Sequence, residues 1–279
     1  VTMLQRTPTY VVSVPDTSSF DDAARRFLSR KRAAWLMRWL GVLTEIAQFQ
    51  LARRFPDFTR RLFISGARKQ LPEGFEKRHL NPPYDPWIQR VCFAPDGDFF
   101  DAITSGVARI ETGNIERISA DRAHLREGGE IEADVIVKAT GLELLVFGEI
   151  AMSVDGEPVN PPDRLVYKGA MLAGVPNFIF VVGYTNASWT LKAELIARFA
   201  SRFIGEVERN GARSGTPVAP PGPMETVPLL NLDSGYIRRA QSTLPKAGDR
   251  SPWRLHMNYF ADRRELLGAD LHDGAIDFD

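Results

Sequence analysis

A strand-like run followed directly by a long amphipathic helix constrains this chain more than any other feature. Residues 178–182 are aromatic and β-branched and end at Gly183, after which helical spacing runs over residues 188–209. Leu195, Ile196, Phe199, Phe203 and Val207 share one face of that helix, and Gly211 is its expected C-cap. A strand, a glycine and a polar loop at a helix N-terminus form an edge that can bind anions and carbonyl groups.

Other segments add strands and helices in alternation, which predicts an α/β chain. Residues 1–4 form the first predicted strand, and residues 133–137 form another that leads into Ala139-Thr140-Gly141. Between them we expect helices over 18–55 and 58–70, a proline-rich loop over 71–86, and hairpins over 107–125. Residues 212–228 are predicted as a loop, and the last fifty residues as irregular structure with short helices.

Composition narrows the class of protein. With 44% hydrophobic and 25% charged residues among 279, the sequence predicts a folded globular protein rather than a disordered or fibrous one. Cys92 is the single cysteine, and the four histidines lie far apart, so we expect neither a disulfide nor a metal site. No run of about 20 apolar residues and no signal peptide is visible, which favours a cytoplasmic protein.

The two ends of the chain differ in charge although the net charge is zero. Residues 1–90 hold 16 Lys+Arg against 8 Asp+Glu, and the rest hold 19 against 27. The basic part suits phosphates, an acidic membrane surface or the acidic part of the same chain. No nucleic-acid motif accompanies the charge, and the apolar stripe over residues 35–46 is expected to be core, so we expect no nucleic-acid partner.

Four sets of polar residues are candidates for binding. Arg6 and Thr7 follow the first strand, where an arginine can bind the 2′-phosphate of NADP. A solvent-exposed arginine with no binding role would give the same sequence pattern. Arg90 ends a loop stiffened by prolines and aromatic residues, where it is either a fixed cation or half of a salt bridge. Thr140-Gly141 and the 183–188 loop suit close approach to a cofactor or, equally, an ordinary turn and helix cap.

These motifs in this order resemble the class B flavin monooxygenases of the Baeyer–Villiger type. The resemblance rests on Gln5-Arg6-Thr7-Pro8, on Tyr84, Pro86 and Arg90, on Ala139-Thr140-Gly141, and on the Gly183–Lys192 and Asn231–Tyr236 runs. It is strongest to the branch that contains the ethionamide-activating monooxygenase. It implies FAD and NADPH as cofactors, and oxidation of a small ketone to an ester or of a sulfide to a sulfoxide.

The resemblance also implies a domain plan and a missing part. We expect an NADPH-domain strand over 1–15, a helical insertion over 16–82, the rest of the NADPH domain over 83–138, and the C-terminal part of the FAD domain over 139–279. The family's glycine-rich turns are absent, since the sequence contains no G-x-G, and it opens inside a strand. We therefore expect a partial, Rossmann-like flavoprotein that lacks its N-terminal FAD motif and is inactive alone unless another polypeptide supplies that half.

The family's functional residues map onto eight positions. Arg90 matches the catalytic arginine, which stabilises negative charge during oxygen transfer. The positions expected to contact cofactor are Arg6, Thr7, Gln89, Thr140, Gly141, Asn186 and Ala187. Gln89 stands where relatives often have lysine, which removes one cation from the predicted NADP site. The alternative function is a non-catalytic remnant or binding module whose basic helices associate with a partner or with a membrane surface.

Overall fold

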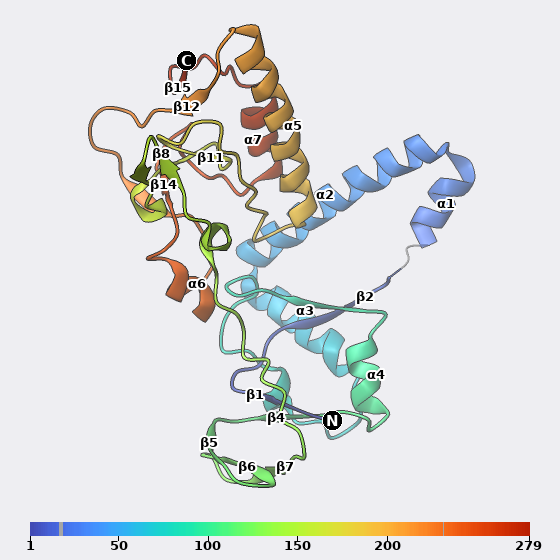
Figure 1. Cartoon of the computed structure of the whole chain (residues 1–279). Coiled ribbons are helices and arrows are strands. Elements are labelled where there is room, and N and C mark those ends of the chain that lie inside the picture. The colour runs from blue at the N-terminus through green and yellow to red at the C-terminus, as the bar shows by residue number, and fades with distance from the viewer. Residues whose placement is uncertain (17–18, 231) are drawn as a thin grey trace. The chain divides into compact units, whose positions relative to one another are not determined.

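The computed structural model describes residues 1–16, 19–230 and 232–279 as two compact units, Val1–Thr140 and Gly141–Asp279 (Figure 1). Each unit has its own helices and strands and is described separately. Both mix the two kinds of element, so the predicted α/β class is confirmed. The expected helix start at Ser18 and the motif residue Asn231 lie outside the described residues.

The first unit begins with a strand, continues into helices and returns to strands. Its elements are β1 (Thr2–Gln5), β2 (Val11–Val14), α1 (Ser19–Phe27), α2 (Arg30–Arg54), α3 (Pro56–Arg68), the 3-10 helix η1 (Lys77–Leu80), β3 (Cys92–Pro95), α4 (Asp98–Thr104), β4 (Arg109–Thr112), β5 (Ile115–Ile118), β6 (Arg122–Leu125) and β7 (Glu130–Glu132). The predicted opening strand is confirmed as β1.

Two parallel strand pairs and one antiparallel sheet organise this unit. β1 pairs with β4 from Thr2 opposite Arg109 to Gln5 opposite Thr112, and β2 pairs with β3 in the same parallel sense. β5, β6 and β7 form an antiparallel sheet, which confirms the hairpins expected near residues 107–125. Parallel strands need long connections, and the three helices supply one between β2 and β3.

The three helices fill the segment predicted to be helical. Phe55 and Pro56 separate α2 from α3, because proline lacks an amide hydrogen and fits best in the first turn of a new helix. The expected apolar core of α2 is wrong in part. Val42 is 1% exposed, but Trp35 is 62% and Leu43 54% exposed. Only Ala33, Val42 and Ala52 are buried among the described residues of this helix, and the other apolar side chains of the stripe are half-buried or exposed.

Residues 133–137 do not form the predicted buried strand. The segment after β7 has no regular secondary structure and pairs with no described strand, and Val135 and Val137 are 79% and 82% exposed. β-branched residues favour a strand only where neighbouring strands can pair with it and cover it. The described part of this chain offers no such partner.

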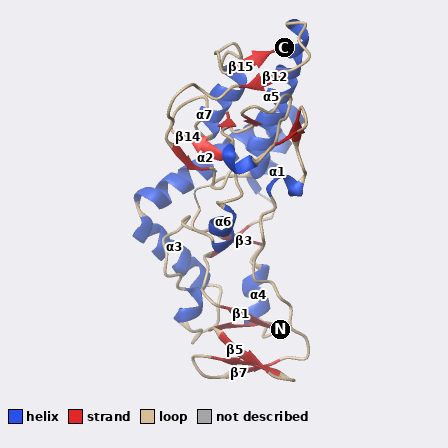
Figure 2. Cartoon of the chain, turned by 60° about the vertical axis from the view of Figure 1, so that its left-hand side comes forward, coloured by secondary structure: helices blue, strands red, loops and turns tan. Residues whose placement is uncertain are grey.

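The second unit carries one long helix among short strands (Figures 1 and 2). Its elements are η2 (Val146–Glu149), β8 (Ser153–Val154), β9 (Glu157–Pro158), η3 (Pro161–Asp163), β10 (Val166–Tyr167), β11 (Met171–Leu172), α5 (Trp189–Arg209), β12 (Gly215–Pro217), β13 (Thr226–Pro228), α6 (Gly235–Ala240), β14 (Lys246–Gly248), α7 (Tyr259–Arg263), the π-helix η4 (Arg264–Gly268) and β15 (Ile276–Phe278). β12 and β13 lie inside the segment expected to be a loop, so that expectation is wrong there.

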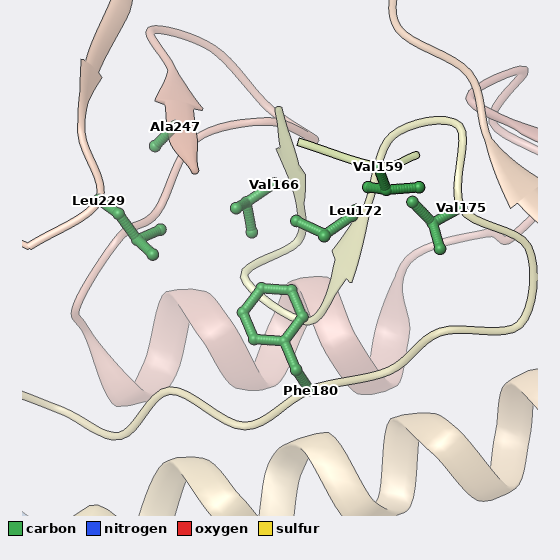
Figure 3. Close-up of a cluster of buried hydrophobic side chains, with 7 residues drawn as sticks. All are labelled: Val159, Val166, Leu172, Val175, Phe180, Leu229 and Ala247. Carbon is green, nitrogen blue, oxygen red and sulfur yellow. The ribbon is translucent and has the colours of Figure 1, made fainter. Parts of the chain in front are cut away.

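A cluster of buried aliphatic and aromatic side chains forms a core of this unit (Figure 3). The cluster consists of Val159, Val166, Leu172, Val175, Phe180, Leu229 and Ala247. Phe180 points into it from residues 178–182, but these residues form only a single bridge, between Met171 and Ile179, rather than the predicted strand. The apolar composition of residues 178–182 therefore indicates a buried segment but does not indicate strand pairing.

Helix α5 confirms the strongest prediction from the sequence. Leu195, Ile196, Phe199 and Phe203 are all buried on one face. Asn210 caps the helix, and Gly211 follows with a positive φ of 64°, the left-handed conformation that commonly ends a helix.

Candidate functional site

The first candidate position is the turn after β1 in the first unit. Arg6 and Thr7 are exposed and follow directly on the carboxyl end of a strand in a parallel pair, while Pro8 is buried. Among the described residues Arg6 makes no ion pair and no side-chain hydrogen bond. An exposed guanidinium at this place can bind an anion such as a phosphate.

The loop that carries Arg90 is fastened to that turn by two tyrosines. The Tyr10 hydroxyl donates to the Tyr84 carbonyl at 2.6 Å, and the Tyr84 hydroxyl donates to the Pro8 carbonyl at 3.2 Å. The Cys92 amide donates to the Tyr10 carbonyl at 2.8 Å. Burial raises the pKa of both tyrosines above its usual value, so they remain neutral donors at physiological pH. The structure thus brings two predicted segments, 5–8 and 84–90, together in one unit.

Aromatic packing and one half-buried hydrogen bond hold the loop further. Trp87 adopts a positive φ of 64°, and its ring lies 5.8 Å from that of Phe63 on α3 and 6.3 Å from that of Phe49 on α2. Arg60 on α3 donates to the Pro82 carbonyl at 2.6 Å. The loop is therefore held by the tyrosine hydrogen bonds, by α2 and by α3, and these contacts define the position of the backbone from which the Arg90 side chain extends.

Arg90 itself is exposed and, in the part of the chain that the structure describes, forms no salt bridge. The salt-bridge alternative therefore finds no partner among the described residues, and the role of Arg90 as a cation at the site stays a prediction. Its neighbour Gln89 is half-buried and forms a bridge with Pro86. Two exposed guanidinium groups, Arg6 and Arg90, thus stand on two connected turns.

Thr140 and Gly141 lie at the border between the two units. Both are exposed within a segment without regular secondary structure, and Gly141 has a φ of 104°, which only glycine adopts without strain. A Cβ added at Gly141 would meet no atom within 4 Å. The described residues therefore leave open space beside this glycine.

In the second unit, the loop before α5 is shaped by Gly183. The indole of Trp189, the first residue of α5, lies so close to Gly183 that any Cβ there would overlap it. Asn186 and Ala187 are half-buried, and the Asn186 side-chain amide donates to the Met257 carbonyl at 3.0 Å. The side-chain amide of Asn186, a residue predicted to bind cofactor, is therefore already bonded to a backbone carbonyl of the same unit.

The sequence analysis missed a buried charged pair beneath this loop. Lys192 and Asp262 form an ion pair of 2.7 Å with side chains 0% and 4% exposed. A second buried lysine, Lys168, pairs with Asp273 at 3.0 Å. The position of Lys192 beside Leu191 and Leu195 on the apolar face of α5 is the signal that could have revealed it.

Two kinds of feature are absent from the described residues. No group of three or more His, Cys, Asp or Glu side chains is placed to hold a metal ion. Within the same residues, no helix combines the length and the apolar character that a membrane span requires.

Comparison with known proteins gives extended similarity to one kind of enzyme. The chain is 41% identical over all its 279 residues to the FAD-containing monooxygenase EthA of Mycolicibacterium smegmatis, and covers 57% of that protein. It is 38% identical over its full length to the probable FAD-binding monooxygenase AlmA of an Acinetobacter species, of which it covers 56%. The chain thus spans a little over half the length of these curated relatives. No family model matches it.

Solved structures agree with the fold. A crystal structure of cyclohexanone monooxygenase from Rhodococcus sp. Phi1, bound to NADP+, matches the whole of this chain and 62% of its own with a TM-score of 0.61. The sequence identity is 14%, so this likeness supports the fold alone.

Proposed function

This chain is homologous over its whole length to the C-terminal part of FAD-containing monooxygenases, and from that premise we propose that it supplies the NADPH-binding and part of the FAD-binding surface of such an enzyme. The resemblance predicted from its motifs is confirmed by these relatives. The full enzyme would oxidise a small ketone to an ester, or a sulfide to a sulfoxide.

One observation carries this proposal: Arg6 and Arg90 are exposed cations on turns joined by the Tyr10 and Tyr84 hydrogen bonds. Arg6 would bind the 2′-phosphate of NADPH, with the Thr7 hydroxyl as a second donor. Arg90 would stand over the flavin and stabilise negative charge as oxygen is transferred. Bound FAD would supply the oxygen-activating chemistry, and the protein would supply orientation and charge.

The residues of the second unit fit the flavin less directly. Thr140 and the open backbone at Gly141 would face the cofactor, and so would Ala187. Asn186 would act through the backbone of its loop, because its side-chain amide is already bonded to Met257. These 279 residues contain no G-x-G turn for a pyrophosphate, so we propose that an N-terminal part like that of the longer relatives completes the FAD site.

Complementation tests this proposal. The chain would be co-expressed with the N-terminal part of the M. smegmatis relative, and the purified complex examined for bound flavin by visible absorption and for NADPH oxidation. We expect flavin in the complex and little in the chain alone. Stoichiometric FAD in the 279 residues alone would contradict the requirement for an N-terminal part.

Two substitutions test the residue assignments in that complex. Arg90→Ala should lower kcat about 10²–10³-fold, the usual effect of removing one preorganised donor. Arg6→Ala should weaken NADPH binding roughly 10–100-fold and leave NADH binding nearly unchanged, because only NADPH carries the 2′-phosphate. Arg26→Ala, an exposed arginine on α1, is the matched control and should change neither value.

A second candidate function rests on the exposed apolar side chains of the basic helices. Phe27 is 82% and Trp35 62% exposed, on helices that also carry many arginines. This combination suits binding to an anionic membrane surface. Sedimentation with anionic and neutral vesicles tests it: retention only by anionic vesicles supports this function, and no retention by either refutes it.

A further inference from the structure

One charged side chain lies on the buried face of α5, whose other buried residues are apolar. Lys192 is completely buried, next to Leu191 and Leu195, and its ammonium lies 2.7 Å from Oδ1 of Asp262 on α7. Burying two charges carries a desolvation cost that often exceeds their attraction, so an apolar pair could hold the helices together equally well. The pair therefore suggests a role other than stability.

A third side chain from the loop before α5 contacts this pair. Tyr184 is 1% exposed, and the centre of its ring lies 5.6 Å from the Lys192 ammonium, within the range of a cation–π interaction. Burial and the nearby charge of Asp262 raise the pKa of Tyr184 above its usual value, so its hydroxyl stays protonated. The loop is thus tied to the ion pair through the first residue after Gly183.

The same loop has a second connection to the segment around α7. Asn186 donates to the Met257 carbonyl at 3.0 Å, immediately before Asn258. Oδ1 of Asn258 accepts hydrogen bonds from the amides of Phe260 and Ala261 and so caps α7. Loop 184–188 and the segment 257–262 are therefore connected by two contacts. One is the hydrogen bond from Asn186 to Met257, and the other is the buried contact of Tyr184 with the Lys192–Asp262 ion pair.

We propose that Lys192, Asp262 and Tyr184 form a positioning lock that sets the backbone of loop 184–188. Hydrophobic contact is non-directional, whereas an ammonium paired with one carboxylate oxygen and placed over one ring fixes both distance and orientation. The lock presents Asn186 and Ala187 in one conformation. This inference rests on the proposed function, in which that loop contributes to the flavin site, and it makes Lys192 and Asp262 positioning residues.

Hydrogen–deuterium exchange of the purified 279-residue chain tests the lock without any cofactor. In Lys192→Met the amides of residues 184–192 and 257–262 should exchange at least ten-fold faster, while those of residues 196–205 in the same helix should change less. Lys168→Met is the matched control, because it removes a lysine that is equally buried but paired with Asp273. Its effect on residues 184–192 should be absent.

The double variant Lys192→Met/Asp262→Leu separates positioning from stability, and also serves where the single variant fails to fold. It removes both charges, so its Tm should return close to the original value, while exchange in loop 184–188 stays fast. Unchanged exchange in the double variant, or an equal effect in Lys168→Met, overturns the lock.

Flavin binding in the complemented protein then tests the connection to function. The double variant should bind FAD at least ten-fold more weakly, and Lys168→Met should bind it normally. Unchanged FAD affinity overturns the connection to the flavin site. If the complemented original protein binds no FAD, the proposed function fails, while the exchange result still decides whether the lock exists.

Discussion

At the scale of single residues, Gly183 is the position where the absence of a side chain is required most clearly. Its backbone lies against the Trp189 indole, so the loop can turn into α5 only if no Cβ intervenes. The sequence marks this glycine only as the end of an apolar run. The close approach of the indole depends on the three-dimensional turn and is not visible from spacing.

Gly183→Ala should therefore destabilise the second unit by about 1–3 kcal/mol through overpacking against Trp189. The measurement is urea unfolding followed by tryptophan fluorescence. Gly205→Ala is the control, because Gly205 lies in α5 with no atom within 4 Å of an added Cβ. It should be neutral or stabilising by up to about 1 kcal/mol. Equal effects of the two variants would contradict the role of the indole.

His79 gives a pH dependence to the first unit. Its side chain is 5% exposed, and its Nδ1 lies 2.7 Å from the Thr112 hydroxyl. Burial lowers the pKa of His79 below the usual 6.5, and Arg78 adds to this effect. As the pH falls from about 6.5 toward the folded pKa, the unfolded chain binds more protons than the folded one. The stability that the neutral ring contributes is fully present above about pH 6.5 and is lost as the pH falls from there through the folded pKa.

The expected result is a free energy of unfolding that falls between pH 7.5 and 5, with a slope from this group of at most about 1.4 kcal/mol per pH unit. His79→Gln should have a shallower slope, measured by urea unfolding at several pH values. The carboxylates are common to both proteins, so the difference between the two slopes isolates the histidine. Identical slopes would show that His79 does not titrate differently on folding.

At the scale of elements, the sequence predicts the helices, which depend on neighbouring residues, better than the strands, which depend on pairing with distant segments. Helix α5 and the break at Pro56 follow from spacing and from proline chemistry, and both are confirmed. Residues 133–137 and 178–182 have strand composition, yet neither pairs as a strand, because pairing depends on partners distant in the chain. For the same reason the sequence locates Arg6 and Arg90 but not the tyrosines that join their turns.

Tyr10 is the element-scale connection that can be tested directly. Tyr10→Phe keeps the edge-to-face contacts with Phe63 and Tyr84 but leaves the Tyr84 carbonyl without its 2.6 Å donor. We expect a loss of about 1–2 kcal/mol in the free energy of unfolding, measured in urea. Tyr84→Phe removes the longer 3.2 Å bond and should cost less. A larger loss in Tyr84→Phe would reverse our ranking of the two bonds.

At the scale of the whole molecule, the chain consists of two units with a border at Thr140 and Gly141. The family resemblance predicts a domain boundary between residues 138 and 139, two residues before this border, and the assignment of the domains stays a prediction. Which unit binds which cofactor stays a prediction. Arg6 and Arg90 belong to the first unit, and the 183–188 loop belongs to the second.

The border itself should be the first site of proteolysis. Lys138 is exposed in a segment without regular secondary structure, next to the exposed Val135 and Val137. The arginines of α2 lie in a helix that must unfold locally before a protease can bind them. Brief trypsin treatment should therefore cut after Lys138 and give two fragments of nearly equal size, identified by mass spectrometry. Lys138→Gln should remain intact over the same period. If the earliest cuts in the original chain fall within α2 instead, that helix is less stable than its hydrogen bonding indicates, and the border is protected.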